Sequence, residues 1–174
     1  MNLKQHLLDR NLKWNWEEIA KYCIKHPESI QDIVNFCMDE EVRIQQNAGA
    51  VLGKIVDYDT NVLKPYLNQI VEQLLQNPHD AVKRATMRVF QTAYLDEDYE
   101  GELFEFVINA LKSPDEAIAI KAFGMTVARR ICQKYPELAA ELIPRIEILV
   151  EQKASAGIVN RGEKELKILR NLAH

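Results

Sequence analysis

The side chains that most often bind metals or perform catalysis are few in this 174-residue chain, and they lie far apart. Its four histidines, at positions 6, 26, 79 and 174, form no H-x-x-x-H pair and no cluster with the three cysteines. A zinc site needs several such ligands converging on one ion. Sequence patterns for phosphate-binding loops and for serine nucleophile elbows are also missing. We therefore expect no catalytic residue, no metal site and no cofactor.

Positive charge, by contrast, is concentrated in four segments. Residues 41–56, 80–95, 116–134 and 158–172 contain thirteen Lys and Arg against five Asp and Glu, a net charge of +8. Because the whole chain carries −4, everything outside these segments carries −12. Such a separation focuses a positive field toward an acidic partner. The residues that we expect to contact this partner are Arg84, Arg88, Arg129, Arg130, Arg161 and Lys164.

The same basic residues have a simpler explanation. The helix dipole favours Lys and Arg near helix C-termini, which accounts for Arg129, Arg130 and Lys134 without any partner. Arg84 and Arg88 are harder to explain in this way, because they lie one helical turn apart on one face. The sequence leaves both interpretations open: a basic binding groove or a solvated helix surface.

Helices are the elements that must position these residues, since apolar residues recur at helical spacing along nearly the whole chain. One such face combines Trp16, Ile19, Ala20 and Cys23. Glycine and proline number only six each, which is few for an all-β chain rich in turns. We predict an all-α fold of about nine or ten helices. In it, Trp14 and Trp16 either seal one end of the core or offer a binding platform.

Three short segments repeat one pattern: a turn, an acidic residue, then a β-branched residue that opens an apolar helix. They lie at residues 38–42, 77–82 and 113–118. From Val42 to Val82 is 40 residues, and from Val82 to Ile118 is 36. Two helices per unit at this spacing are typical of a stacked helical repeat. In the last of the three turns, the sequence predicts Ser113 as the helix cap and Pro114 as the first helical residue.

Prolines add a further repeated feature, because Leu63-Lys64-Pro65-Tyr66-Leu67 and Leu142-Ile143-Pro144-Arg145-Ile146 both place a proline inside a helical pattern. These motifs resemble the HEAT repeat, whose first helix often carries a Leu-Pro-x-Leu kink. Its second helix opens with an acidic turn and Val-Arg, which Val42-Arg43 and Val82-Lys83 match.

The HEAT resemblance covers about residues 29–172 as roughly four helix-pair repeats, with residues 1–28 as N-terminal capping helices. It implies one domain over residues 1–174, folded as an armadillo-like, right-handed α-α superhelix. In such solenoids the second helices line the concave surface. The resemblance therefore implies that the basic segments face a partner across that surface.

Residues 154–162 are similar to the ending of small bacterial HEAT-like proteins that often carry an adenylosuccinate lyase label. True members of the lyase superfamily are far longer and have a Ser-rich signature loop, which this chain lacks. The chain also offers no convergent acid and base. We expect no lyase activity and would regard such a label as a misannotation.

Bulk properties favour a cytoplasmic protein. Hydrophobic residues make up 47% of the chain and charged residues 28%, which is ordinary for a folded domain. No run approaches the roughly 18 uninterrupted apolar residues of a spanning helix, and the N-terminus does not resemble a secretory signal. The three cysteines, an odd number with apolar neighbours, are typical of reduced core residues.

Together these features predict a non-enzymatic binding or scaffold module that holds an acidic or amphipathic segment of another protein. The partner is a protein or peptide, with no membrane, and the oligomeric state is left open. The alternative is a nucleic-acid-binding protein related to the HEAT-like glycosylases that excise alkylated bases. A pI near 5.6 argues against that alternative, although a local basic patch could suffice.

Overall fold

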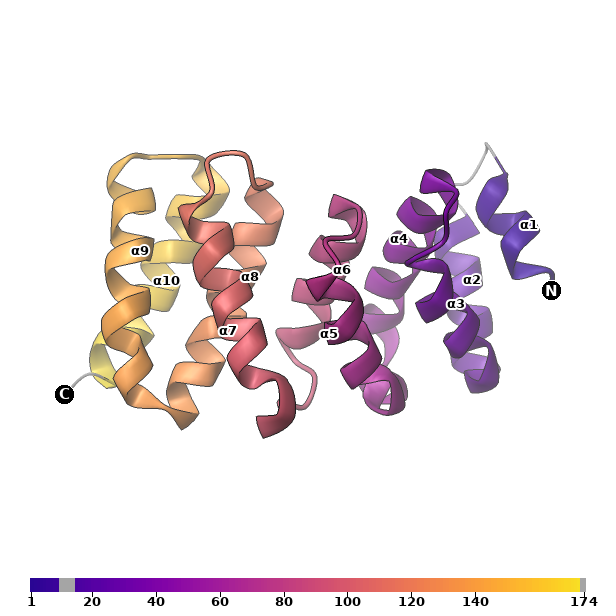
Figure 1. Cartoon of the computed structure of the whole chain (residues 1–174), viewed down its shortest axis with the longest axis horizontal. Coiled ribbons are helices and arrows are strands. Elements are labelled where there is room, and N and C mark those ends of the chain that lie inside the picture. The colour runs from indigo at the N-terminus through magenta and orange to yellow at the C-terminus, as the bar shows by residue number, and fades with distance from the viewer. Residues whose placement is uncertain (10–14, 173–174) are drawn as a thin grey trace. The chain divides into compact units, whose positions relative to one another are not determined.

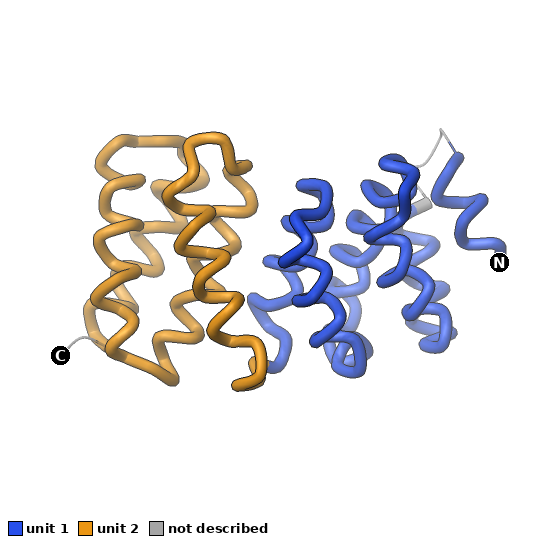
Figure 2. Tube along the Cα trace, in the orientation of Figure 1, with its two compact units in different colours: residues 1–94 blue, residues 95–174 orange. Residues whose placement is uncertain are grey.

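The computed structural model describes residues 1–9 and 15–172, and within these ranges it contains α-helices and short 3₁₀-helices but no strand (Figure 1). The predicted all-α fold is therefore confirmed. Trp14 and His174 lie outside the described residues. The chain divides into two compact units, residues 1–94 and 95–174, which are coloured separately in Figure 2 and are described separately below as unit 1 and unit 2.

Unit 1 contains six α-helices and two 3₁₀ segments in its described part. In chain order they are α1 (Leu3–Leu8), α2 (Asn15–Lys25), η2 (Pro27–Ser29), α3 (Ile30–Phe36), α4 (Val42–Tyr58), η3 (Thr60–Tyr66), α5 (Leu67–Leu75) and α6 (Asp80–Phe90). Helix α4 is central, because it packs against α1, α2, α3 and α6. Each helix buries one apolar stripe, as the sequence periodicity predicts.

In its described part, unit 2 contains four α-helices, arranged as two antiparallel pairs, and one 3₁₀ segment (Figure 1). They are α7 (Glu97–Lys112), α8 (Ile118–Lys134), η4 (Pro136–Leu138), α9 (Ala139–Glu151) and α10 (Ala156–Leu172). Helix α7 packs against α8 and α9, and α10 packs against α8 and α9. The pairs α7/α9 and α8/α10 therefore form two layers, and the second helix of each hairpin lies in the α8/α10 layer.

The repeat is more regular than the turn pattern of the sequence suggests. The second helices α4, α6, α8 and α10 begin at residues 42, 80, 118 and 156, a constant interval of 38. The third residue of each is Ile44, Val82, Ile120 or Ile158, and all four are at most 1% exposed. Burial of such a side chain contributes roughly 1.5–3 kcal/mol. These four buried residues, which occupy the same position of each repeat, define the register of the repeat.

The sequence intervals of 40 and 36 residues bracket this repeat length, and they differ from it because they compare unlike positions. Val42 and Ile118 are the first residues of their helices and are 55% and 52% exposed. Val82 is the third residue of its helix and is 1% exposed. The β-branched residue after the turn is therefore on the surface in two repeats and in the core in the third.

One local prediction at the turns is corrected. Ser113 ends α7 and does not cap α8, which begins at Ile118 after Ala117. Of the two prolines, Pro65 lies in a 3₁₀ segment that precedes the regular helix α5, whereas Pro144 lies inside α9. Only the first of them marks a helix start.

Candidate functional site

The second helices carry the positive charge of both units. With their observed bounds, α4 and α6 sum to +3 in unit 1, and α8 and α10 sum to +6 in unit 2. In unit 2 the opposite layer, α7 and α9, sums to −6. Charge separation between the two layers is therefore strong within unit 2 alone.

In unit 1 the two predicted arginines stand one turn apart on α6 but have different surroundings. Arg84 is exposed and has no partner among the described residues. Arg88 is 39% exposed and pairs with Asp57, in the last turn of α4, which also lies 3.8 Å from Lys54. The predicted segment ended at residue 56 and so left Asp57 out. An exposed pair of this kind contributes about 0–1 kcal/mol to stability.

In unit 2 the predicted Arg129 is fixed by a buried carboxylate. Glu165 on α10 is 1% exposed, and Arg129 Nε on α8 donates to its Oε2 at 2.8 Å. The Thr126 hydroxyl donates to Glu165 Oε1 at 2.6 Å. Arg129 also donates to Gln133 Oε1 from Nη1 at 2.6 Å. These bonds satisfy both oxygens of a carboxylate that has left water, which is the condition for burying it.

The remaining predicted residues surround this pair. Arg161 donates from Nη1 to Thr126 Oγ1 at 2.6 Å, and its guanidinium lies 5.8 Å from the centre of the Phe123 ring. Arg130 is half-buried, and burial is the main cause that lowers the pKa of its guanidinium, followed by the charge of Arg129. Lys164 is exposed on α10. The structure thus brings Arg129 and Arg161 together through Thr126, whereas Lys164 faces solvent.

From the sequence pattern of charges, Glu165 counts only as one acidic residue among the basic ones, and its structural role is not apparent. The repeat interval provides the missing signal. Val51, Val89 and Val127 precede Glu165 at intervals of 38, and all three are fully buried. An acidic residue at a position that is otherwise valine predicts a buried carboxylate, and a buried carboxylate requires a cationic partner nearby.

Trp16 is part of the packing of unit 1. Its indole N–H donates to Asn47 Oδ1 at 3.1 Å, and the Asn47 amide donates to the Leu7 carbonyl at 2.7 Å. Asn47 is 8% exposed, so these bonds satisfy a largely buried amide that links α1, α2 and α4.

Two further findings concern the described residues only. No group of three or more His, Cys, Asp and Glu side chains among them could hold a metal ion. None of their helices is both long and apolar enough to cross a membrane.

Comparisons with known proteins give one match. The sequence model of the HEAT repeat domain family matches residues 3–167, nearly the whole chain. No curated protein and no solved structure matches it. HEAT repeats commonly mediate protein interactions and are typically non-catalytic. With this match and its all-helical repeats, the chain belongs to the HEAT repeat domain family.

Proposed function

We propose that this protein is a non-enzymatic binding module that holds an acidic or amphipathic segment of another protein against its second helices. The observation that carries the proposal is the charge separation within unit 2, where α8 and α10 sum to +6 and α7 and α9 to −6. A surface of one sign attracts partners of the other sign and rejects those of the same sign.

Exposure decides which basic residues contact the partner directly. Arg84 on α6 and Lys164 on α10 are exposed and have no hydrogen bond or ion pair with another described side chain, so each can pair with an acidic side chain. Lys167, one turn beyond Lys164 on α10, has the same exposure and extends this surface. The side chain of Arg129 is only 16% exposed and pairs with Glu165, so we expect it to hold Glu165 in place and not to contact the partner.

A peptide-binding assay tests this function. The probes are two fluorescently labelled amphipathic peptides with one helical pattern, one of Glu and Leu and one of Lys and Leu. Fluorescence anisotropy should report binding of the Glu peptide only, and the affinity should fall as added salt screens the charges. Arg84→Glu and Lys164→Glu should each weaken binding by roughly three- to tenfold, the effect expected for solvent-exposed charge pairs.

The matched control is Lys112→Glu. Lys112 is also exposed and without a partner among the described residues, but it lies on the acidic helix α7, so its reversal should leave the affinity unchanged. Equal binding of both peptides would contradict the proposal. A labelled DNA duplex is the third probe, and salt-dependent binding of the duplex alone would favour the nucleic-acid alternative.

A further inference from the structure

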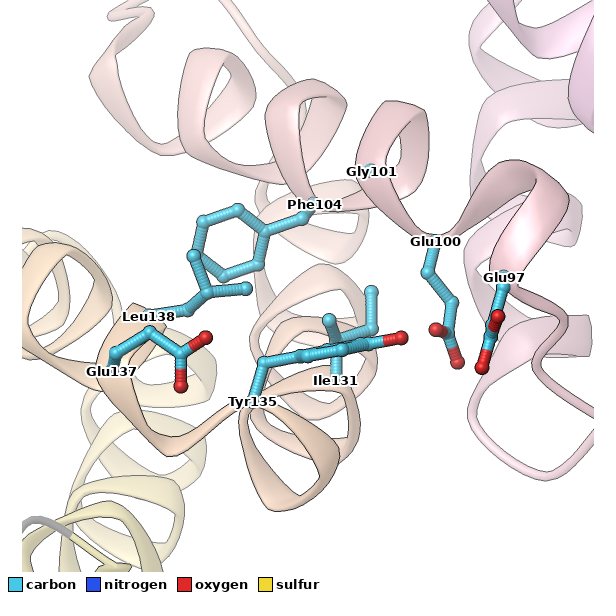
Figure 3. A pocket seen from close by; sticks show the side chains of 8 residues that line it. All are labelled: Glu97, Glu100, Gly101, Phe104, Ile131, Tyr135, Glu137 and Leu138. Carbon is cyan, nitrogen blue, oxygen red and sulfur yellow. The ribbon is translucent and has the colours of Figure 1, made fainter.

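Unit 2 contains a pocket on the side of its acidic helix α7. The pocket has a volume of about 340 Å³ and lies between α7, the C-terminal end of α8 and the short segment η4. Its apolar lining comes from Phe104, Ile131, Leu138 and the ring of Tyr135. Figure 3 shows these side chains on one side of the pocket and two glutamates, Glu97 and Glu100, on the other. Small-molecule sites typically occupy about 300–1,000 Å³ and combine apolar walls with a few polar groups.

Glu100 is the unusual member of this lining. It is 2% exposed, yet its Oε2 is buried without a hydrogen-bond partner. The other oxygen, Oε1, accepts a hydrogen bond from Lys134, whose ammonium is 42% exposed and lies 5.7 Å from the centre of the Tyr135 ring. A buried carboxylate oxygen normally finds a donor, because nothing else replaces its lost hydration. Oε2 therefore has no hydrogen-bond donor of its own, while the Tyr135 hydroxyl also faces the Glu100 carboxylate, which raises the pKa of that hydroxyl.

The charge around the pocket defines the ligand class. Three carboxylates line it, Glu97, Glu100 and Glu137, against two nearby cations: Lys134, which pairs with Glu100, and Arg130, which feels the charge of Glu100. The remaining charge repels anions and attracts a cation that can donate to Oε2. The rings of Phe104 and Tyr135 favour an apolar or aromatic body and can also interact with a cation through their faces.

We propose that this pocket binds an organic cation, a protonated amine or a guanidinium carried on an apolar body, with the cationic group donating to Glu100 Oε2. The pocket includes the C-terminal end of the basic helix α8, but its binding of a cation does not rest on the function proposed above. The cation can belong to a free small molecule or to a lysine or arginine side chain of another protein. The chemistry is the same, and the assay below distinguishes the two sources.

The assay titrates the full chain with matched ligands and follows its amide resonances by NMR. Benzamidinium and phenethylammonium should bind and shift the amides of α7 and η4, whereas their neutral counterparts, benzamide and phenethyl alcohol, should not. A third ligand, acetyl-Gly-Arg-Gly-amide, represents a side chain on a peptide. Tighter binding of the peptide than of benzamidinium would assign the site to a protein partner, and the reverse order would assign it to a small molecule.

Three variants test the role of Glu100. Glu100→Gln should weaken benzamidinium binding by about ten- to hundredfold, the change expected when a charged hydrogen bond is lost. The control Glu102→Gln removes the same charge from an exposed position of α7 outside the lining and should have little effect. Lys134→Met should strengthen binding by roughly three- to tenfold, because it removes the competing cation.

A fourth variant reduces the volume of the pocket and leaves the charge of its lining unchanged. Gly101 lines the pocket, and a Cβ at this position would meet no atom within 4 Å, so Gly101→Leu should fold and fill part of the space. It should abolish binding of benzamidinium. The proposal is wrong if the neutral and cationic ligands bind equally, if none binds the wild-type chain, or if Glu100→Gln and Glu102→Gln change the affinity alike.

Discussion

The second helices of unit 1 and unit 2 share one 38-residue repeat. Within each unit the two second helices pack against each other, and the residues in this contact, called the seam, differ between the units. In unit 1, α4 and α6 place Val51 and Val89 at equivalent core positions, and both are fully buried. In unit 2, α8 places Val127 at this position and α10 places Glu165, which is 1% exposed. The backbone pattern is the same, while one seam is apolar and the other contains a carboxylate.

This difference changes what a nearby arginine does. Arg88 in unit 1 pairs with Asp57 at the surface, where both side chains keep more than a third of their exposure. Arg129 in unit 2 is 16% exposed and pairs with a carboxylate that has lost nearly all contact with water. Two arginines that contribute equally to the charge of the second helices therefore have different physical roles. One remains available at the surface, and the other compensates a charge in the core.

The largest expected effect comes from removing each arginine in turn. Arg129→Ala leaves Glu165 buried without its cation and should lower the free energy of unfolding by about 3–5 kcal/mol. Arg88→Ala removes a solvent-exposed pair and should cost no more than about 1 kcal/mol. Urea unfolding followed by circular dichroism measures both values.

A second substitution separates the loss of the pair from the loss of side-chain packing. Glu165→Val introduces the residue that the other three repeats have at this position, so Arg129→Ala combined with Glu165→Val should recover much of the lost stability. Equal costs for Arg129→Ala and Arg88→Ala would mean that Glu165 does not depend on Arg129, and the contrast between the two seams would disappear.

Much of the fold was predictable from sequence because helical periodicity and repeated turns depend on local residue types. The register was not, since the turn pattern places Val42 and Ile118 on the surface but Val82 in the core. The role of each basic residue was not predictable either. A count of charges treats Arg84 and Arg129 alike, whereas burial depends on which carboxylate lies opposite, and that requires the register of neighbouring helices.

A smaller effect is expected from filling the close helix contacts of the two units. A Cβ on Gly49 of α4 would lie 2.9 Å from the carbonyl carbon and oxygen of Ala81, which are backbone atoms at the start of α6. Gly49→Ala should therefore force the helices apart and cost about 1–3 kcal/mol. A Cβ on Gly162 of α10 would lie 2.5 Å from Cγ2 of the half-buried Val150, a side-chain atom that can move. Gly162→Ala should cost less than Gly49→Ala.

Gly101→Ala is the control for both glycine variants. It adds the same methyl group at a helical position where the new Cβ would have no atom within 4 Å. It should stabilise the protein by about 0.5–1 kcal/mol through helix propensity alone. The midpoint of urea unfolding ranks the three variants. If Gly162→Ala were the most destabilising, the contact between α9 and α10 would be the more rigid one.

A difference in pH dependence is expected between two ion pairs, one in each unit. In unit 1, the hydrogen bond from Lys4, 2.9 Å away, lowers the pKa of Asp39. In unit 2, the hydrogen bond to Glu100 raises the pKa of Lys134. A lowered carboxylate pKa stabilises the fold above the unfolded value of about 3.9, and this contribution is lost as the pH falls through the folded value. A raised lysine pKa stabilises the fold below about 10.4, and this contribution is lost as the pH rises through the folded value.

Asp39→Asn and Lys134→Met should therefore both destabilise the protein at neutral pH, the second by more because it leaves the buried Glu100 without its cation. The difference between wild type and Asp39→Asn should shrink as the pH falls below about 4 toward the lowered folded pKa of Asp39, where the wild-type carboxyl also becomes neutral. The difference between wild type and Lys134→Met should shrink as the pH rises above about 10.4 toward the raised folded pKa of Lys134, where the wild-type ammonium loses its proton. Thermal unfolding of the three proteins across this range measures both trends. Because the lysine of each pair is solvent-exposed, added salt should reduce both differences at neutral pH. A salt-insensitive difference for Lys134→Met would show that its effect comes from lost packing over the Tyr135 ring and not from its charge.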